Sequence, residues 1–386
     1  MKVTFLIGNG FDLNLDLKTH YNDFLPVYTA EDTEGAENKE NQKLLKEFKQ
    51  DIQDEQKHWS DVEVAFGQYT QKMLECNKNA GDFCRCHEDF CEKLAEYLRQ
   101  EEAKIDFGAL KAKLGTSFAQ SIAFQNIIGG FREESQDQLK QSADHYPDGF
   151  DYNFISFNYT STLDKCIEYV RGNVDLLEKR TYKNYIYGNS IGELFHIHGY
   201  TDEDMVLGVN DESQISAPEL FNGFGPEYKS QLIKQQTNVL NERGIDKKVA
   251  SLILNSSLIY IYGMSIGATD ALWWKRIAAA MNSQPFLRLI IHCHNAPKGK
   301  LIRREFQTFS REQKEKFLSF SDLTSEEKSK IMDRIHIDNS NIFAPLHETV
   351  TKKPLLGKEL AQAFAKAADS TIQISSIGAD LWHDSF

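Results

Sequence analysis

Long apolar runs are missing from this sequence. The longest, around Leu258–Met264, falls well short of the roughly 20 residues that a membrane helix needs. An internal repeat and a low-complexity block are also missing, while hydrophobic residues make up 41% of the chain and charged residues 26%, as in ordinary folded proteins. These features exclude a membrane-spanning, a fibrous and a wholly disordered protein.

Positive charge and cysteine are also in short supply. The chain has 44 Lys and Arg against 57 Asp and Glu, a formal net charge of −13, which repels a polyanion and disfavours a nucleic-acid surface. Only six cysteines occur, and the N-terminal residues run straight into Gly8–Asp12 without the small-residue cleavage site of a secretory signal. We therefore expect a cytoplasmic protein that contacts neither membrane nor nucleic acid.

The length of 386 residues predicts two or three structural units. The first apolar run, Lys2–Ile7, has the composition of a strand, and after residue 150 further strand-like runs alternate with helical stretches. This alternation is typical of a mostly parallel sheet, so we predict a Rossmann-like α/β core. Its later strands are expected at Tyr152–Phe157, Tyr182–Tyr187, Leu194–His198, Met205–Val209, Leu258–Tyr262 and Leu287–His292.

Helical segments interrupt and follow this core. Thr29–Lys57 has few apolar residues and predicts a solvated insertion, whereas apolar residues recur at helical spacing from Trp59 to Phe131. Near the C-terminus, Ile335–Phe343 is expected at the sheet edge, and one more helix is expected from Lys358. We divide the chain into an α/β nucleotide-binding core (residues 1–28 and 150–300), a helical insertion (29–149) and a mainly helical C-terminal region (301–386).

The first candidate site is the turn after Lys2–Ile7. Gly8 and Gly10 leave room for the backbone to approach a phosphate or ribose, although Leu13 stands where the dinucleotide fingerprint has its third glycine. The alternative is that the glycines only form a turn. Asp12 offers a similar choice, because its carboxylate can hold a ligand or cap the next segment.

Two further candidates follow later strands. The amide of Asn158 both accepts and donates, so it can orient a water or a ribose hydroxyl, or it can cap the next helix. His196 and His198 share a face of their predicted strand, which makes a metal pair conceivable, but a third ligand is not evident. A single general base at His198 is more economical, and a hydrogen-bonded structural histidine is the alternative.

A late glycine turn after Leu258–Tyr262 is the last candidate. Gly263 precedes Ser265, which can bond a ribose or phosphate, and Asp270, which can be its partner or cap a helix. Two cysteine- and histidine-containing groups receive no chemical role. Packing is a sufficient explanation for His292–His294. The second group consists of Cys76, Cys84, Cys86, His87 and Cys91, and because its spacing matches no paired zinc motif, we predict no metal there.

Together these motifs resemble the bacteriophage abortive-infection AbiH family. The resemblance covers residues 2 to 270 as separated islands that occur in the family's order. The first and the fourth islands are the more specific ones. The islands are Gly8–Leu13, Leu17–Phe24, Trp59–Glu63, Phe157–Leu163 and His196–Gly199.

The AbiH family in turn resembles sirtuin-like NAD-consuming domains. In these, a Gly-x-Gly turn, an Asn-Tyr segment, a His-Gly pair and a late glycine turn line one NAD pocket, and all four occur here in that order. The sequence departs from the pattern at Asn9, Thr160 and Met264, and it lacks the four-cysteine zinc ribbon of protein deacetylases. The resemblance therefore implies an NAD hydrolase rather than a deacylase.

For this site the resemblance implies cleavage of the bond between nicotinamide and ribose, with NAD as substrate and without a tightly bound cofactor. Asn158 positions water or ribose hydroxyls and His198 acts as the base. In the cell this implies a phage-defence effector that drains NAD. The residues expected to bind the nucleotide are Gly8, Asn9, Gly10, Phe11, Asp12, Gly263, Ser265 and Asp270.

Two other functions stay open from the sequence. A nucleotide-binding sensor or scaffold would use the same pocket without turnover, while a nuclease toxin lacks an evident metal–carboxylate cluster and suffers from the charge of −13. A silent effector also needs a restraint. The Thr29–Lys57 insertion and the helical subdomain can supply that restraint or an interface in a homo-oligomer, and the sequence does not choose between them. A phage-derived trigger is a further partner that such an effector implies.

Overall fold

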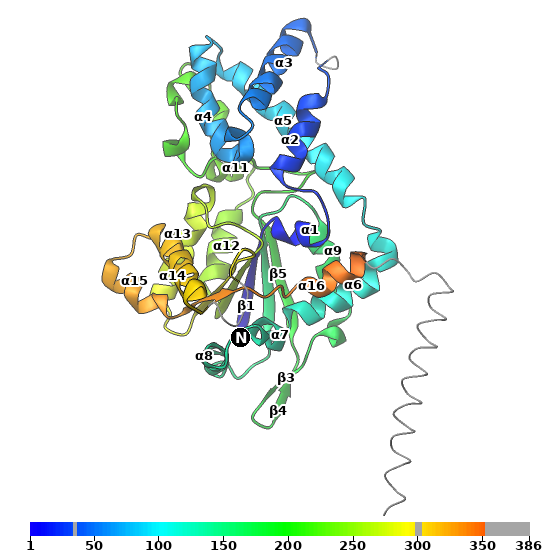
Figure 1. The fold of residues 1–386 in the computed structure, drawn as a ribbon, viewed down its shortest axis with the longest axis vertical. Coiled ribbons are helices and arrows are strands. Elements are labelled where there is room, and N and C mark those ends of the chain that lie inside the picture. Colours follow the sequence, from blue (N-terminus) through cyan, green and yellow to red (C-terminus); the bar gives the residue numbers. More distant parts are fainter. Residues whose placement is uncertain (34–36, 298–302, 352–386) are drawn as a thin grey trace, which may run out of the picture. The chain divides into compact units, whose positions relative to one another are not determined.

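The computed structural model describes residues 1–33, 37–297 and 303–351 (Figure 1). Residues Met1–Thr349 form one compact unit, and of the second unit, Val350–Phe386, only the first two residues are described. The helix predicted from Lys358 lies outside the described residues. Within them, no helix combines the length and the hydropathy that crossing a bilayer requires.

A six-stranded sheet forms the centre of the first unit, and all of its neighbouring strands run parallel. The strand order is β5-β2-β1-β6-β7-β8, so the chain moves outward on one side of β1 and then returns to the other side (Figure 1). This confirms the predicted Rossmann-like α/β fold. The strands are β1 Lys2–Ile7, β2 Asp151–Ser156, β5 Ser190–His196, β6 Leu258–Tyr262, β7 Arg288–His292 and β8 Ile335–Asp338.

The sheet register fixes where a ligand can bind. Ile7, the last residue of β1, pairs with Ser156 of β2 on one side and with Tyr262 of β6 on the other. The turns that follow these three strands therefore leave the sheet at the same edge. Because successive connections leave β1 in opposite directions, the switch point of this doubly wound sheet lies between β1 and β6.

Helices make up most of the remaining described chain, and the predicted helical C-terminal region is present. Before β2 come α1 Gly10–Asn14, α2 Tyr21–Ala30, α3 Lys39–Asp54, α4 Val62–Glu75, α5 Ala80–Glu102, α6 Phe107–Ile122, α7 Phe124–Gly129 and α8 Glu133–Ala143. After β2 come α9 Thr162–Gly172, α10 Pro226–Ser230, α11 Lys234–Leu240, α12 Ile245–Leu254, the short 3-10 helix η5 Ala268–Asp270, α13 Ala271–Ser283, α14 Arg303–Ser319, α15 Ser325–Met332 and α16 Ala344–Thr351.

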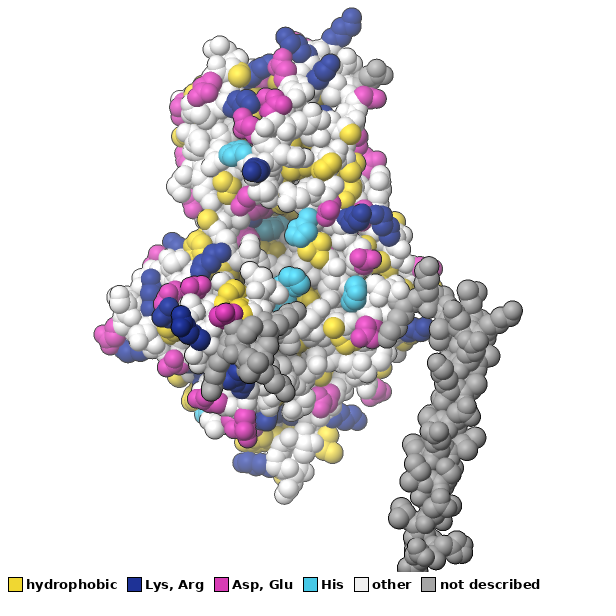
Figure 2. Space-filling model, in the orientation of Figure 1, with side chains coloured by type: hydrophobic (Ala, Val, Ile, Leu, Met, Phe, Trp, Pro, Cys, Tyr) yellow, Lys and Arg dark blue, Asp and Glu magenta, His cyan; other side chains and the backbone are white. Residues whose placement is uncertain are grey.

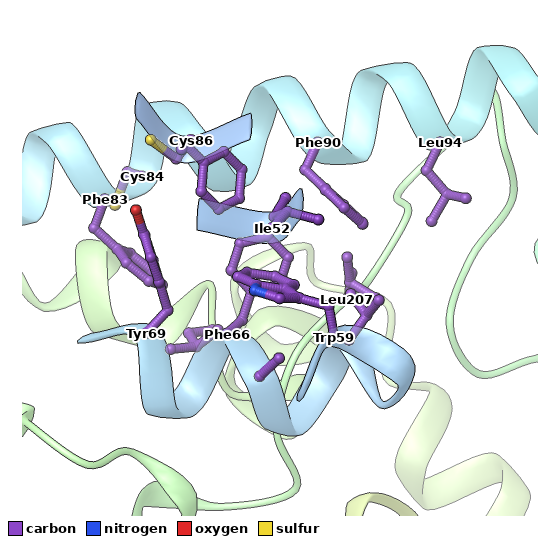
Figure 3. Close-up of a cluster of buried hydrophobic side chains, with 14 of the residues drawn as sticks. Ile52, Trp59, Phe66, Tyr69, Phe83, Cys84, Cys86, Phe90, Leu94 and Leu207 are labelled. Atoms are coloured by element: carbon purple, nitrogen blue, oxygen red, sulfur yellow. The ribbon is translucent and has the colours of Figure 1, made fainter. Parts of the chain in front are cut away.

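The helices α2 to α5 enclose an aromatic core of their own, and Figure 3 shows side chains of α3, α4 and α5 around Trp59 in this core. Trp59 is its centre, with ring centroids 5.5 Å from Phe48 and 5.2 Å from Phe66. Phe48 and Ile52 lie four residues apart on one buried stripe of α3. The prediction that Thr29–Lys57 is a solvated insertion is therefore wrong for its apolar residues on α3, which are spaced so that Leu44, Leu45, Phe48 and Ile52 face this core.

One strand prediction is wrong, and a second is right about the strand but not about its place in the central sheet. In Met205–Val209, Leu207 and Val209 insert into the helical core, and the segment pairs only through an isolated bridge between Val209 and Ile233. Its apolar composition reflects that burial rather than a place in the sheet. Tyr182–Tyr187 forms part of a separate hairpin, β3 Arg180–Tyr182 with β4 Tyr185–Tyr187, whose turn bends at Lys183 with φ 51°. By contrast, β8 confirms the predicted edge strand.

Candidate functional site

A cavity of about 1010 Å³ opens at the carboxyl ends of β1, β2, β6 and β7. This is the switch point at which doubly wound sheets bind their ligands. Histidine side chains gather around the middle of the face in Figure 2. Five histidines line the cavity: His20, His198, His292, His294 and His347.

The turn after β1 packs directly against the turn after β6. The Gly10 amide donates to the Gly263 carbonyl at 2.6 Å, and a Cβ on Gly10 would lie 2.4 Å from the Gly263 Cα. Gly263 itself has φ +71°, a conformation that favours glycine. Gly8 is similarly confined, since its Cβ would meet the Met264 Cβ at 2.5 Å. The glycines thus bring two cavity-lining turns together, whatever the cavity holds.

Asn9 and Phe11 lie in the same turn but face different surroundings. The Asn9 amide donates to the Thr19 carbonyl at 3.1 Å and accepts from the Thr19 hydroxyl, which ties the turn to the segment before α2. Asn9 lines the cavity, whereas Phe11 is fully buried against the rings of Phe118 and Phe343. The structure therefore places Phe11 in the core and not among the residues that line the cavity.

Asp12 is a buried carboxylate held by hydroxyl groups. The Thr160 hydroxyl donates to it at 2.7 Å and the Thr162 hydroxyl donates to its other oxygen. Burial raises the pKa of Asp12 to about 6, against the opposing effect of these two hydrogen bonds. Asp12 thereby links the turn after β1 to the turn after β2.

Asn158 brings an unpartnered group to the cavity. Its side-chain nitrogen is buried and has no hydrogen-bond partner, while its backbone carbonyl oxygen lies 2.9 Å from the His196 Nδ1. The other ring nitrogen of His196 lies 2.9 Å from the Asp164 carboxylate. Both ring nitrogens of His196 therefore have partners of their own, and none of these partners is His198. In the part of the chain that the structure describes, no three side chains lie close enough together to hold a metal ion.

His198 lies against a buried charge cluster. Its Nε2 is 3.5 Å from the Asp270 carboxylate and makes no hydrogen bond. Lys234, at the start of α11, contacts Asp270 at 3.1 Å and Glu63 of α4 at 2.8 Å. Burial disfavours the charge on Asp270, but Lys234 and then His198 hold the pKa of that carboxyl well below its usual range.

Glu63 and Lys234 were not predicted to belong to the site. Glu63 follows Asp61, whose side chain caps α4, so it resembles the acidic residue common in a first helical turn. Lys234 belongs to a polar stretch, Lys234–Thr237, that nothing distinguishes from an exposed helix start. Only the tertiary fold brings these two side chains, 171 residues apart, into contact.

The late turn contributes more of the cavity wall than predicted. Ser265 is exposed and lines it with Gly263 and Asp270. His292–His294 also lines it, so the expectation that this segment only packs is wrong. The His292 ring stacks on Tyr262 at 4.5 Å, and burial raises the pKa of the Cys293 thiol to about 11. Side-chain alternation alone did not reveal that β7 ends at the cavity.

Three cysteines of the helical insertion, Cys84, Cys86 and Cys91, pack within or beside its core, whereas Cys76 is exposed. Cys84 and Cys86 are buried on α5, and the Cys91 sulfur lies 3.9 Å from the His87 ring. All six cysteines of the chain are free thiols. Burial raises the pKa of Cys86 and Cys91 above the usual thiol value, which keeps both protonated and unreactive at neutral pH.

These observations define an α/β protein with an open parallel sheet and a ligand-sized cavity at its switch point. A comparison with protein families makes the assignment specific. The family described as bacteriophage abortive infection AbiH matches residues 4–292, so the chain belongs to this family of phage-defence proteins. Comparisons with curated proteins and with solved structures returned no match.

Proposed function

We propose that this abortive-infection protein hydrolyses NAD to nicotinamide and ADP-ribose in the cavity at the switch point. The observation that carries the proposal is the pair of buried, unpartnered polar atoms, Asn158 Nδ2 and His198 Nε2, on residues that line this cavity. Buried polar groups in proteins almost always have partners, so these two favour a ligand or an ordered water between them. His198 also has the Asp270 carboxylate beside it.

The proposed reaction exchanges one bond to the ribose for another. The bond between ribose C1′ and the nicotinamide nitrogen breaks, and its electron pair neutralises the ring, which leaves as nicotinamide. A water oxygen bonds to C1′, and the water proton passes to His198 and then to solvent. General-base assistance of this kind contributes roughly 10²–10⁴-fold. Asn158 orients the water or the ribose hydroxyls, and the nearby Asp270 carboxylate stabilises the His198 ring once it has taken up the proton.

The remaining cavity residues fit a dinucleotide. The cavity volume of about 1010 Å³ is at the upper end of the range for small-molecule sites. We assign Gly8, Asn9 and Gly10 to the pyrophosphate and Ser265 to a ribose, as the resemblance to sirtuin-like domains implies. NAD is then a substrate that turns over, and no tightly bound cofactor is required.

The test is incubation of the purified protein with NAD, with nicotinamide and ADP-ribose quantified together. The variants His198→Ala and Asn158→Ala are expected to release at least about 100-fold less nicotinamide than the wild type. His145→Ala is the matched control, because His145 is exposed and packs against Phe286 outside the cavity. Full activity in both cavity variants would overturn the assignment.

A protein that is silent on its own needs a second assay. An effector that awaits infection is expected to cleave NAD once extract from phage-infected cells is added. Bound NAD that stays intact with and without extract would replace hydrolysis by the sensor function. Loss of RNA with stable NAD would replace it by a nuclease.

A further inference from the structure

Lys234 is the only cation in direct contact with the two carboxylates beside His198, within the part of the chain that the structure describes. It is 6% exposed, and its ammonium group also lies 3.3 Å from the Thr269 carbonyl. Burial opposes its charge, yet Asp270 and Glu63 raise the pKa of Lys234 above its ordinary value. The lysine is therefore charged and shared between two carboxylates.

The two carboxylates respond differently to the shared lysine. Asp270 is held ionised, whereas burial raises the pKa of Glu63 even though Lys234 contacts it at 2.8 Å. With both carboxylates ionised the cluster carries one more negative charge than positive. Such an excess favours the protonated form of a neighbouring imidazole.

The cluster joins three segments that are distant in sequence. Glu63 comes from the first turn of α4 in the helical insertion, Lys234 begins α11, and Asp270 ends η5 at the sheet edge. The Lys234 amide donates to the Val209 carbonyl at 3.0 Å, which fixes the start of α11 against the segment that enters the helical core. The helical insertion thus places a charge beside the candidate base.

Two aromatic rings from the segment after β2 also pack against His198. The Phe157 ring lies edge-on to it at 5.5 Å and the Tyr159 ring is tilted at 6.1 Å. Arg243, in the segment before α12, donates at 3.2 Å to the carbonyl of Ile197, the residue that precedes His198. The charged groups that face His198 are Asp270, which contacts it, and Glu63 and Asp246, while Lys234 contacts Asp270 and Glu63.

We infer that Lys234 and Glu63 are positioning residues that set the protonation of His198 through Asp270, Lys234 by favouring the neutral ring and Glu63 by favouring the charged one. The kinetic part of this inference rests on the proposed hydrolysis of NAD. The charge-setting part does not, because it concerns the protein without ligand.

The signs of the expected effects follow from the charges. Removing the Lys234 charge leaves two carboxylates near the ring, so His198 should titrate at higher pH. When the Glu63 charge is removed, the Lys234 ammonium neutralises Asp270 alone, so His198 should titrate at lower pH. A charge change at this range moves a pKa by about one unit or more. The acid limb of the pH–rate profile, where the base loses its proton, should move with the titration.

The experiment follows the His198 ring proton by NMR across pH in the full-length protein, with His198→Ala to assign the signal. We expect Lys234→Met to raise the midpoint and Glu63→Gln to lower it, each by about one pH unit. The charge-balanced double variant should return close to the wild type. The matched controls are Lys229→Met and Glu212→Gln, which break a more exposed ion pair of 2.9 Å and should leave the midpoint in place.

The outcomes separate this inference from the proposed function. Opposite shifts support it, and they do so even if NAD is never cleaved, in which case the hydrolase function alone fails. Shifts of equal sign, or none, overturn it even if NAD is cleaved normally. Should Lys234→Met fail to fold, Lys234→Arg must keep the wild-type midpoint and Glu63→Gln must lower it, and an unmoved Glu63→Gln midpoint would overturn the inference by itself.

Discussion

The turns after β1 and after β6 both carry a buried carboxylate to the same cavity, yet the two carboxylates have opposite electrostatic character. Asp12 meets two threonine hydroxyls, and its pKa rises to about 6. Asp270 meets the ammonium of Lys234 and the ring of His198, and its pKa falls well below the usual range.

This difference shows that the hydrogen-bond or ion-pair partner, and not burial, determines whether the pKa of such a carboxylate rises or falls. Burial disfavours the charged form in both turns. Hydroxyl donors offset part of that penalty, whereas a cation in contact reverses it. The turn after β1 therefore serves to hold segments together, and the turn after β6 carries a permanent charge that can act on a base.

The largest effect is expected when the charge of Asp270 is removed. In Asp270→Asn the histidine loses the neighbouring carboxylate that stabilises its protonated ring, so we expect the rate of nicotinamide release to fall roughly 10²–10⁴-fold. Initial rates at saturating NAD measure it, with circular dichroism as the check on folding. A well-folded variant that keeps the wild-type rate would remove Asp270 from the mechanism.

The next effect concerns the contact between the two turns. Gly10→Ala forces a Cβ to within 2.4 Å of the Gly263 Cα, so the turns must separate. Overpacking of this kind costs about 3 kcal/mol of unfolding free energy, which urea denaturation measures. Gly172→Ala is the matched control, because a Cβ there meets no atom within 4 Å. Equal stability of the two variants would contradict the close packing of the turns.

The third prediction sharpens the comparison through pH. A carboxyl whose pKa rises from 3.8 to about 6 on folding costs the folded state about 3 kcal/mol at neutral pH. The contribution of Asp12 to stability is therefore greatest below pH 3.8 and is lost as the pH rises through 6. The difference in unfolding free energy between the wild type and Asp12→Asn, measured at several pH values, should show this slope.

Asp270 should give the opposite slope in the same experiment. Its pKa is lowered on folding, so its contribution is present above pH 3.8 and is lost as the pH falls further. The comparison of the wild type with Asp270→Asn tests this below pH 5. Slopes of equal sign for the two aspartates would show that the two turns do not differ as described.

The smallest effect tests the tether of the first turn. Asn9→Ala removes two hydrogen bonds to Thr19, which should cost about 1–2 kcal/mol of unfolding free energy. Thr19→Val should cost less, since it removes only one of the two. Thermal unfolding of both variants gives the ranking, and a neutral Asn9→Ala would mean that the side chain is available to a ligand instead.

The parallel sheet was predictable because its strands are nearly continuous apolar runs that end at glycine or polar residues. Lys2–Ile7 and Leu258–Tyr262 coincide with strands of the sheet, since both are buried on the two faces. The same signal misled at Met205–Val209, where the apolar residues fill a helical core. An apolar composition predicts that a segment is buried, but it does not predict whether the segment lies in the sheet or packs into a helical core.

The candidate site was predictable where chemistry follows a strand directly. Asn158 and His198 come just after β2 and β5, and the order of parallel strands brings such turns to one edge. Glu63 and Lys234 could not be foreseen, because their contact depends on how the helical insertion folds back over that edge. Phe11 shows the reverse error, since a residue inside a motif can serve the core alone.

The proposed function requires NAD to bind in the cavity at the switch point. Hydrogen–deuterium exchange of His198→Ala with and without NAD tests this binding most directly. The variant should bind without cleaving the ligand. We predict slower exchange in the turns that line the cavity, at residues 8–14, 158–160 and 263–270, and unchanged exchange in the β3–β4 hairpin. Protection elsewhere, or none at saturating NAD, would contradict the assignment of this cavity to the nucleotide.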